Sequence, residues 1–140
     1  MITIEQYFGE KILSADATPE RLDNAEELLI RVNGLLAQAY ADEGYFNDLD
    51  PDTGTQISGS KGGAGDGGFR LQKSKTGAKN SKHKDADAVD VFDSGNVLDD
   101  WLTDKILEVH SLYREAPSAT PGWCHLQKSS PGSKRRTFNP

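Results

Sequence analysis

The stretch Ser81-Lys-His-Lys-Asp-Ala-Asp-Ala-Val-Asp90 decides the fold and, together with Trp123-Cys-His125 downstream, the candidate site. It places an imidazole and a carboxylate seven residues apart, and the downstream motif adds a second imidazole. Two histidines and one aspartate are a ligand set with which proteins hold zinc while a fourth position stays open. The two stretches therefore predict a zinc site made by His83, Asp90 and His125.

Two short strands are expected to carry these ligands. The run 88–92 is β-prone, and its period of two puts Asp90 on the face opposite the two valines. The run 123–127 has the same pattern, with His125 on the face opposite its apolar neighbours. His83 lies in a Lys- and Asp-rich loop, so the chain has to turn for Asp90 to point towards it. A lone His or Asp is more often a surface or packing residue, and the prediction rests on their combination.

The pattern Ser81-x-His83-x-x-Ala86-x-Ala88-x-Asp90, followed by Trp123-x-His125, resembles the D-alanyl-D-alanine carboxypeptidase family of zinc peptidases. That family includes peptidoglycan-cleaving phage endolysins and vancomycin-resistance dipeptidases, and it shares a metal-binding core with the hedgehog signalling domain. The resemblance extends from about residue 68 to the C-terminus. It implies that the two histidines and the aspartate bind Zn²⁺ and that the substrates are peptidoglycan peptides.

A second motif extends the resemblance upstream. Gly68-Phe69-Arg70 looks like the family's Ser-Gly-(aromatic)-Arg segment. The resemblance implies that Arg70 contacts a substrate carboxylate or the developing oxyanion. Ser81 would orient the first ligand or a substrate carboxylate.

The chain departs from the family pattern at two positions. Ala86 stands where a Gly is usual, which is costly if the backbone angle φ is positive there. Gly122 stands where many members carry a catalytic Glu, three residues before the last His. A metallopeptidase needs a group that takes a proton from water and returns it to the leaving amine. Glu115, ten residues before His125, is the nearest candidate.

Glu115 could reach the metal if the Pro-containing segment 116–122 folds back over it. The arrangement Glu-x-Pro-x-x-Thr-Pro-x-Trp-x-His, which this chain has, resembles a subset of phage members. The alternative is that Glu115 is a solvated residue at the end of a helix. In that case the next residues to test as the base are Asp85, Asp87 and His110.

Two amphipathic segments predict helices. The first runs from about Pro19 to Tyr40, with Thr18 as its N-cap and an apolar residue at alternating spacings of three and four. The second runs from Val97 to about Tyr113. His110 would lie on this second helix, where nothing pairs with it at a metal-binding spacing.

Length and composition indicate one domain over residues 1–140, with an N-terminal helical part (1–45) and a metal-binding core (67–140). Hydrophobic residues make up 35% of the chain and glycines number 14, so a modest core and long loops are expected. The single cysteine excludes an intramolecular disulfide. Cys124 is expected to be a small buried hydrophobe.

The N-terminus has no basic segment followed by a long apolar one, and no window resembles a membrane span. The expected location is the cytoplasm of a host cell, with action on the periplasmic cell wall after release, or else a virion.

Other motifs give weaker signals. Carboxylates alternate over 48–52 as in a calcium loop, but position twelve is Gly59, and a plain Asp/Gly turn is favoured. The glycine-rich stretch 59–68 lacks the Gly-Lys-Ser/Thr order of a phosphate-binding loop. Five lysines between residues 73 and 84 predict a solvated loop, with attraction to the cell wall as the next reading. Residues 135–138 are a candidate edge strand beside the strand of His125.

The sequence therefore predicts an α+β fold in which helices pack on a small antiparallel sheet that carries a zinc site. The predicted function is zinc-dependent hydrolysis of a peptide bond in peptidoglycan. The main alternative is a peptidase-like binding or structural module of a phage virion, which would contact other virion proteins. A nucleic-acid-binding protein fits less well because the net charge of the chain is -6, and no membrane partner is expected.

Overall fold

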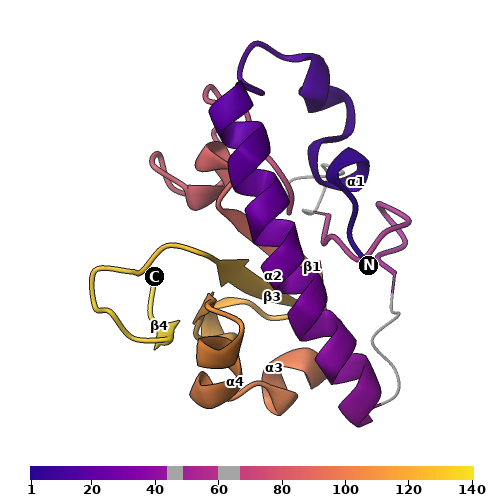
Figure 1. Ribbon diagram of the computed structural model, residues 1–140, viewed down its shortest axis with the longest axis vertical. Helices are drawn as coiled ribbons and strands as arrows, with labels where there is room; N and C mark the ends of the chain where they lie inside the picture. Colours follow the sequence, from indigo (N-terminus) through magenta and orange to yellow (C-terminus); the bar gives the residue numbers. More distant parts are fainter. Residues whose placement is uncertain (44–48, 60–66) are drawn as a thin grey trace.

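A four-stranded sheet with a long helix across one face organises the fold, as Figure 1 shows for the computed structural model. The structure describes residues 1–43, 49–59 and 67–140. Asp48 of the calcium-like turn and residues 60–66 of the glycine-rich stretch lie outside these ranges. In chain order the elements are α1 (Ile4–Phe8), η1 (Gly9–Leu13), α2 (Pro19–Glu43), η2 (Lys82–Asp85), β1 (Ala88–Phe92), α3 (Val97–Trp101), α4 (Asp104–Val109), β2 (Tyr113–Glu115), η3 (Pro117–Ala119), β3 (Trp123–Gln127) and β4 (Thr137–Phe138).

The helix α2 confirms the first predicted helix and extends it to residue 43. It begins as expected, because the Thr18 hydroxyl accepts a hydrogen bond from the Arg21 amide at 3.3 Å and Pro19 occupies the first helical position. Its buried face is wider than the predicted stripe. That face consists of Ala25, Leu28, Leu29, Val32, Leu35, Leu36 and Ala39.

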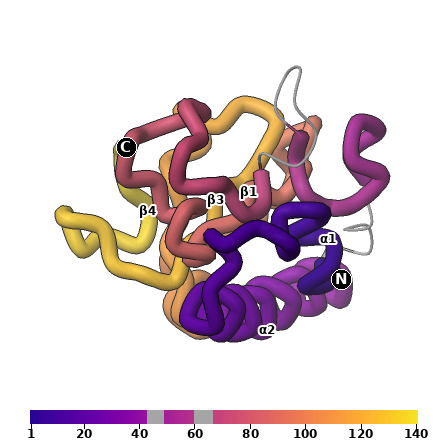
Figure 2. The backbone as a smooth tube through the Cα atoms, turned by 90° about the horizontal axis from the view of Figure 1, so that it is seen from above, coloured from indigo at the N-terminus to yellow at the C-terminus, as the bar shows by residue number. Residues whose placement is uncertain are grey.

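The sheet has the strand order β1-β3-β2-β4. Strands β1 and β3 pair antiparallel, as do β3 and β2, whereas β2 and β4 pair parallel. Seen from above in Figure 2, α2 lies along one side of the sheet. The apolar residues of β1 and β3 that join the core with α2 are Val89, Val91, Cys124 and Leu126. The opposite face of the two strands is therefore left for the site.

The second predicted helix, 97–113, was wrong as a single element. It is broken into α3 and α4 at Leu102, which is extended with φ −66° and ψ 135°. The next residue, Thr103, caps α4 through a hydrogen bond from the Ile106 amide at 3.2 Å. A threonine side chain that accepts a hydrogen bond from a backbone amide favours an N-cap over a helix interior. Thr103 therefore starts a new helix although the apolar pattern continues. Val109, an apolar residue within this predicted helix, is 68% exposed.

The C-terminal strand also differs from its prediction. Residues 137 and 138 do form an edge strand, but β4 pairs with β2 and not with the strand of His125. The difference arises because residues 113–115, expected to end a helix, form β2 and occupy the place beside β3.

The short helix α1 is a feature that the sequence reading did not identify. Thr3 and Gln6 form a capping box at its start, and Tyr7 and Phe8 are buried. The Tyr7 hydroxyl donates to the Ala88 carbonyl at 2.8 Å, and the Tyr7 carbonyl accepts from the Phe69 amide at 3.0 Å. The N-terminal segment thus ties the start of β1 to the segment that leads to Arg70. Among the described residues, no helix has both the length and the apolar character that a membrane span requires.

Candidate metal centre

The first predicted ligand, His83, is held by a short 3₁₀ helix. Ser81 caps η2, and its hydroxyl accepts a hydrogen bond from the His83 amide at 3.3 Å. The ring nitrogen Nδ1 lies 2.8 Å from the Gly68 carbonyl oxygen, a geometry in which the protonated Nδ1 donates. That bond fixes the tautomer and leaves Nε2 as the atom that faces the site.

The other two predicted ligands are cross-strand neighbours. Asp90 of β1 stands directly opposite His125 of β3, on the face away from α2. The distance from His125 Nδ1 to Asp90 Oδ1 is 2.9 Å, and that from His83 Nε2 to the same oxygen is 3.2 Å. Each of the three residues offers one ligand atom, and these atoms lie within 4.8 Å of one another. The structure thus brings together the three residues that the sequence singled out.

One of these atoms lacks a hydrogen-bond partner although it is buried. His83 is 1% exposed, and its Nε2 makes no hydrogen bond within the described structure, although Asp90 Oδ1 lies 3.2 Å from it. A buried polar atom without a partner costs free energy, and native proteins rarely retain one without a reason. Two imidazole nitrogens and one carboxylate oxygen that converge on a point could hold a metal ion, and a bound ion would satisfy His83 Nε2.

The charges of the cluster act on one another. Burial alone would raise the pKa of the Asp90 carboxyl, but the electrostatic attraction of His83 and the hydrogen bond from His125 hold it well below its usual value. Burial alone would lower the pKa of His125, but the hydrogen bond and charge of Asp90, followed by the charge of Glu115, raise it. Asp90 is therefore a carboxylate at neutral pH, as a metal ligand must be.

Gln127 is a site residue that the sequence reading missed. Its side-chain oxygen Oε1 lies 2.9 Å from His125 Nε2, and its Nε2 donates to the Ser129 carbonyl at 2.9 Å. The contact directs His125 Nδ1 towards the cluster, in the way that partners behind metal-bound histidines act. The period of two along β3 could have revealed it, because residue 127 shares a face with residue 125.

Glu115 lies beside the cluster. Its Oε1 is 3.9 Å from His125 Nδ1, and its side chain is 24% exposed. Glu115 is the last residue of β2, and the Pro-containing segment 116–122 reverses the chain into β3, which pairs antiparallel with β2. The expected turn thus brings Glu115 back to the site, and Glu115 ends a strand and not a helix.

Arg70 contacts a predicted ligand. Its Nη2 lies 3.4 Å from Asp90 Oδ2, and its Nη1 lies 3.4 Å from the Ser81 hydroxyl oxygen. Arg70 is 9% exposed and also borders the cavity described below. The guanidinium thus orients the Asp90 carboxylate, a contact that the sequence did not predict, and it also faces the space where a substrate would lie.

The two departures from the family pattern both fall at positive φ. Ala86, which ends η2, has φ 57° and ψ 36°, the left-handed conformation that favours Gly. Gly122 has φ 94°, and a Cβ built there would meet nothing within 4 Å. The space around residue 122 would admit a side chain, but its backbone conformation would be strained with a Glu.

Several other polar residues do not join the cluster. His110 Nε2 lies 2.7 Å from Gln38 Oε1 at the contact with α2, and burial lowers the pKa of His110. Asp87 accepts hydrogen bonds from the amide and hydroxyl of Ser129. Asp85 and Asp87 line a separate hollow of about 480 Å³ near the start of α2.

Cys124 and the calcium-like turn have structural roles. Cys124 is buried, and burial together with the Asp99 carboxylate raises the pKa of its thiol well above the usual value. It is thus not a thiolate nucleophile. Asp50 accepts hydrogen bonds from the amides of Asp52 and Gly59, at 2.7 and 2.8 Å, which is the bonding of an Asp/Gly turn.

A cavity of about 430 Å³ opens over the cluster. Its walls come from the segment before β1, from β3 and from the C-terminal segment. Trp123 and Phe138 give it an apolar part, and the Phe138 ring meets the His125 ring edge-on with centroids 6.4 Å apart. A ligand could thus lie in this cavity with one of its groups at the three converging atoms.

Comparison of the chain with protein-family models, with curated proteins and with solved structures finds no match.

Proposed function

We propose that this protein is a zinc-dependent hydrolase that cleaves a peptide bond in peptidoglycan. The observation that carries the proposal is the convergence of three buried ligand atoms, from His83, Asp90 and His125. The carboxylate of Glu115 lies beside them. A purely structural metal site is normally closed by four protein ligands, whereas three ligands and an open position are typical of catalytic zinc. Among the described residues, the cluster offers three.

The donor set suits a transition metal, and the resemblance to the zinc peptidases selects zinc among these metals. Imidazole nitrogen with a single carboxylate suits Zn²⁺, whereas Ca²⁺ and Mg²⁺ prefer sites made of oxygen ligands. When bound, zinc supplies Lewis-acid chemistry, because it makes water more acidic at neutral pH and polarises a carbonyl group.

The residues around the ligands would supply the remaining functions. Glu115 would accept the proton of the attacking water and return it to the leaving amine. Its position, 3.9 Å from His125 Nδ1 and partly open to solvent, supports this role. Arg70 would stabilise the developing oxyanion or bind a substrate carboxylate, and Ser81 would hold Arg70 and His83 in place.

The choice of peptidoglycan rests on the resemblance of the chain, from about residue 68 to the C-terminus, to the D-alanyl-D-alanine carboxypeptidase family. The cavity supports a peptide substrate in general, since it is open, is lined in part by Trp123 and Phe138, and has Arg70 at its inner wall. Action on a cell wall would follow release from a host cell or delivery by a virion.

Replacement of Glu115 by Gln tests the proposal. The variant keeps the size of the side chain and the metal ligands but loses the proton acceptor, so hydrolysis of purified peptidoglycan should fall by about 10²-fold or more. The zinc content should not change. Glu108→Gln, on the exposed side of α4, is the matched control and should retain full activity.

Other results would point elsewhere. If wild-type protein loaded with zinc leaves peptidoglycan intact, the chain is a binding or structural module of a virion, as the Gly at position 122 would allow. If Glu115→Gln hydrolyses peptidoglycan at the full rate, Glu115 is not the base. Asp85, Asp87 and His110 would then be tested, although none of them lines the cavity.

A further inference from the structure

The charge of the chain is divided unevenly along the sequence. Residues 67–84 contain six Lys and Arg and no Asp or Glu, and residues 128–140 contain four Lys and Arg and no Asp or Glu. These two segments thus hold ten of the 16 basic residues of a chain whose net charge is -6. A distribution of this kind in an acidic protein indicates a local function for the positive charge.

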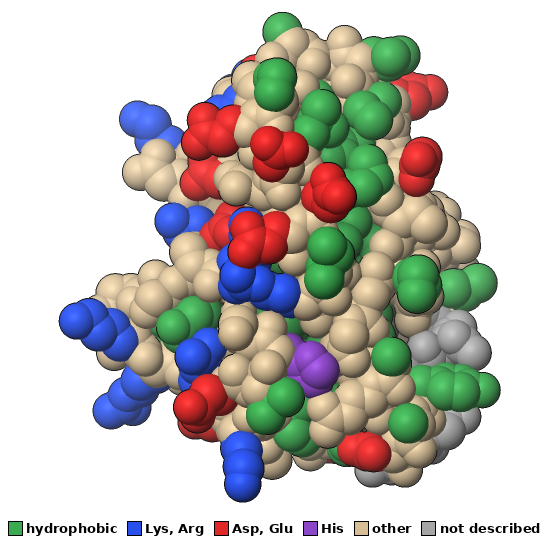
Figure 3. Space-filling model, viewed as in Figure 1, with side chains coloured by type: hydrophobic (Ala, Val, Ile, Leu, Met, Phe, Trp, Pro, Cys, Tyr) green, Lys and Arg blue, Asp and Glu red, His purple; other side chains and the backbone are tan. Residues whose placement is uncertain are grey.

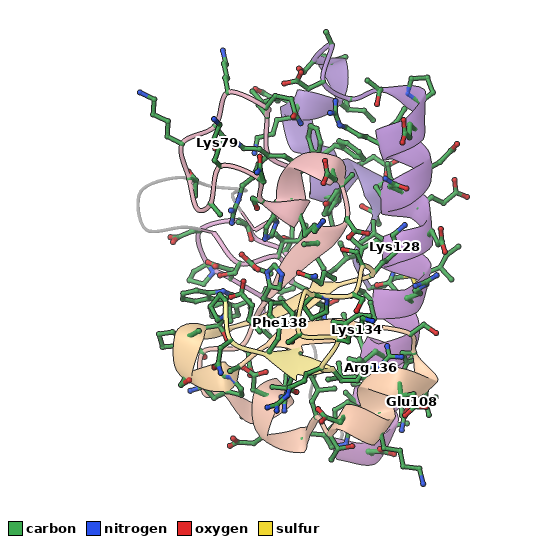
Figure 4. All side chains as sticks on the ribbon, turned by 90° about the vertical axis from the view of Figure 1, so that its left-hand side faces the viewer. Lys79, Glu108, Lys128, Lys134, Arg136 and Phe138 are labelled. Carbon is green, nitrogen blue, oxygen red and sulfur yellow. The ribbon has the colours of Figure 1, made fainter. Side chains whose placement is uncertain are left out.

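The two segments meet at the same cavity. One part of it is lined by Gly77, Ala78 and residues 80–83, and another by Pro131, Phe138 and Pro140. In Figure 1 both segments project from the left-hand side of the molecule, and Figure 4, which views that side, shows Lys79 above Phe138 and Lys134 to the right of it. Figure 3 shows Lys and Arg along this left edge, whereas Asp and Glu gather over the helix α2.

Four of the ten basic side chains are used inside the fold. Arg70 contacts Asp90, and Lys84 donates to the Lys79 carbonyl at 3.1 Å. Lys128 pairs with Glu27 at 3.4 Å, and Arg136 lies over the Tyr113 ring, 4.3 Å from its centroid.

The other six basic side chains are exposed. We call them the cationic rim: Lys73, Lys75, Lys79, Lys82, Lys134 and Arg135. None of them forms an ion pair with any carboxylate that the structure describes. Lys82 lies in the wall of the cavity itself, next to His83. Like charges placed together on two loops repel one another, so their arrangement is stabilised when an anion lies between them.

We infer that the cationic rim binds carboxylates of an acidic cell-wall peptide on both sides of the bond that lies at the metal cluster. The inference rests on the proposed function and adds the charge of the substrate to it. The positive groups stand on two loops, one on each lip of the cavity: residues 73–82 and residues 134–135. A ligand that spans the cavity with a carboxylate at each end would therefore contact both loops. A nucleic acid fits less well, since the basic stretch 73–84 has no exposed aromatic side chain for base stacking.

Binding to purified cell walls tests the inference without hydrolysis. The walls are first stripped of phosphate-containing polymers, and the carboxyl groups of half the sample are converted to amides. Glu115→Gln protein is mixed with each sample on ice, and the bound fraction is measured by sedimentation. We expect about tenfold weaker binding to the amidated walls at ~0.01 M salt, and little difference at ~1 M, where charges are screened beyond about 3 Å.

Rim variants make the test specific. Lys79→Gln combined with Lys134→Gln removes one charge from each lip and should weaken binding to untreated walls severalfold at low salt. Lys105→Gln, on α4 and outside the cavity wall, is the control and should bind like the parent. Equal binding to both kinds of wall, or equal binding by the rim variant and its parent, would overturn the inference.

The same experiment separates the two proposals. If the wild-type protein binds walls through their carboxylates but never hydrolyses them, the proposed role of the cationic rim stands and the proposed peptidase activity is wrong. If the protein hydrolyses walls and neither rim substitution changes the KM at low salt, the peptidase activity stands and the role of the rim is wrong. If a short DNA duplex displaces the protein from untreated walls at a concentration far below that of wall carboxylates, the partner is a nucleic acid and the inference fails.

Discussion

The two faces of the β1–β3 pair are both largely buried but differ in composition. On the face towards α2, Leu126 is 0% exposed and belongs to the apolar core. On the other face its neighbour His125 is 6% exposed and contacts Asp90 across the strands. Strand alternation thus lets one pair of strands supply both the core and the candidate metal ligands.

The contrast explains why the register of the two strands is fixed. Asp90 pairs with His125, and the flanking pairs, Val89 with Leu126 and Val91 with Cys124, are apolar. A shift of one residue would move the apolar side chains to the cavity and bury the charged ones against α2. The core therefore holds the candidate ligands in register, even though none of the core residues that the structure describes lines the cavity.

Among the substitutions on the polar face, removal of a candidate ligand should have the largest effect on metal content. His125→Ala leaves two protein ligands, too few for a tight site, so the purified protein should lose nearly all of its metal, and the stability that the metal adds should be lost with it. Elemental analysis of the folded protein measures this.

The third histidine is the matched control for that substitution. His110→Ala removes an imidazole that contacts Gln38 and not the cluster, so metal content should stay at the wild-type level. Full metal content in His125→Ala would contradict the assignment of the site.

A truncation on the apolar face should have the opposite pattern. Leu126→Ala removes a fully buried side chain and should reduce the free energy of unfolding by about 2–5 kcal/mol. The molecules that remain folded should bind metal as before, since Leu126 points away from the ligands. Denaturant unfolding together with elemental analysis checks both parts, and loss of metal from folded protein would show that the two faces are not independent.

A smaller effect on metal binding is expected from Gln127, which contacts the candidate ligand His125 on the side away from the cluster. Gln127→Met keeps the size of the side chain but removes the acceptor for His125 Nε2, which should lower metal affinity by about 10–100-fold. The control is Gln38→Met, which removes the same contact from His110 and should leave metal affinity unchanged. Competition with a chelator of known affinity measures both variants, and equal affinities would show that Gln127 does not orient the ligand.

What the sequence could predict follows the same division. The ligand strands and the long helix carry regular apolar periods, and both strands and the helix start were confirmed. The three ligands converge as their motif predicted. These features depend on local pattern, and local pattern is what a sequence shows directly.

The parts that the sequence did not reveal depend on contacts between distant segments. The strand β2 has three residues and no period of its own, and it forms because β3 and β4 pair with it. The position of Glu115 follows from that pairing. The break at Thr103 was hidden for another reason. The apolar pattern of 97–113 continues across this position, but Thr103 caps a new helix and so separates α3 from α4.

The smallest predicted effect concerns the turn that brings His83 towards β1. Ala86 is fully buried and has φ 57°, whereas Ala88, also fully buried, lies in β1. A left-handed conformation costs a residue other than Gly about 1–2 kcal/mol. Ala86→Gly would remove that cost, but it would lose about 0.8 kcal/mol from the buried methyl group and about 0.5–1 kcal/mol from the greater freedom of glycine in the unfolded chain.

Ala88→Gly is the control that isolates the backbone. It loses the same buried methyl group and adds about 0.5–1 kcal/mol for glycine in a strand, with no left-handed strain to relieve. We therefore expect Ala86→Gly to be near neutral, and Ala88→Gly to destabilise by about 1.5 kcal/mol. Denaturant unfolding of metal-free protein compares the two, so that metal binding does not contribute. Equal destabilisation by both would mean that Ala86 carries no strain, and the Gly usual at this position in the similar family would then need another explanation.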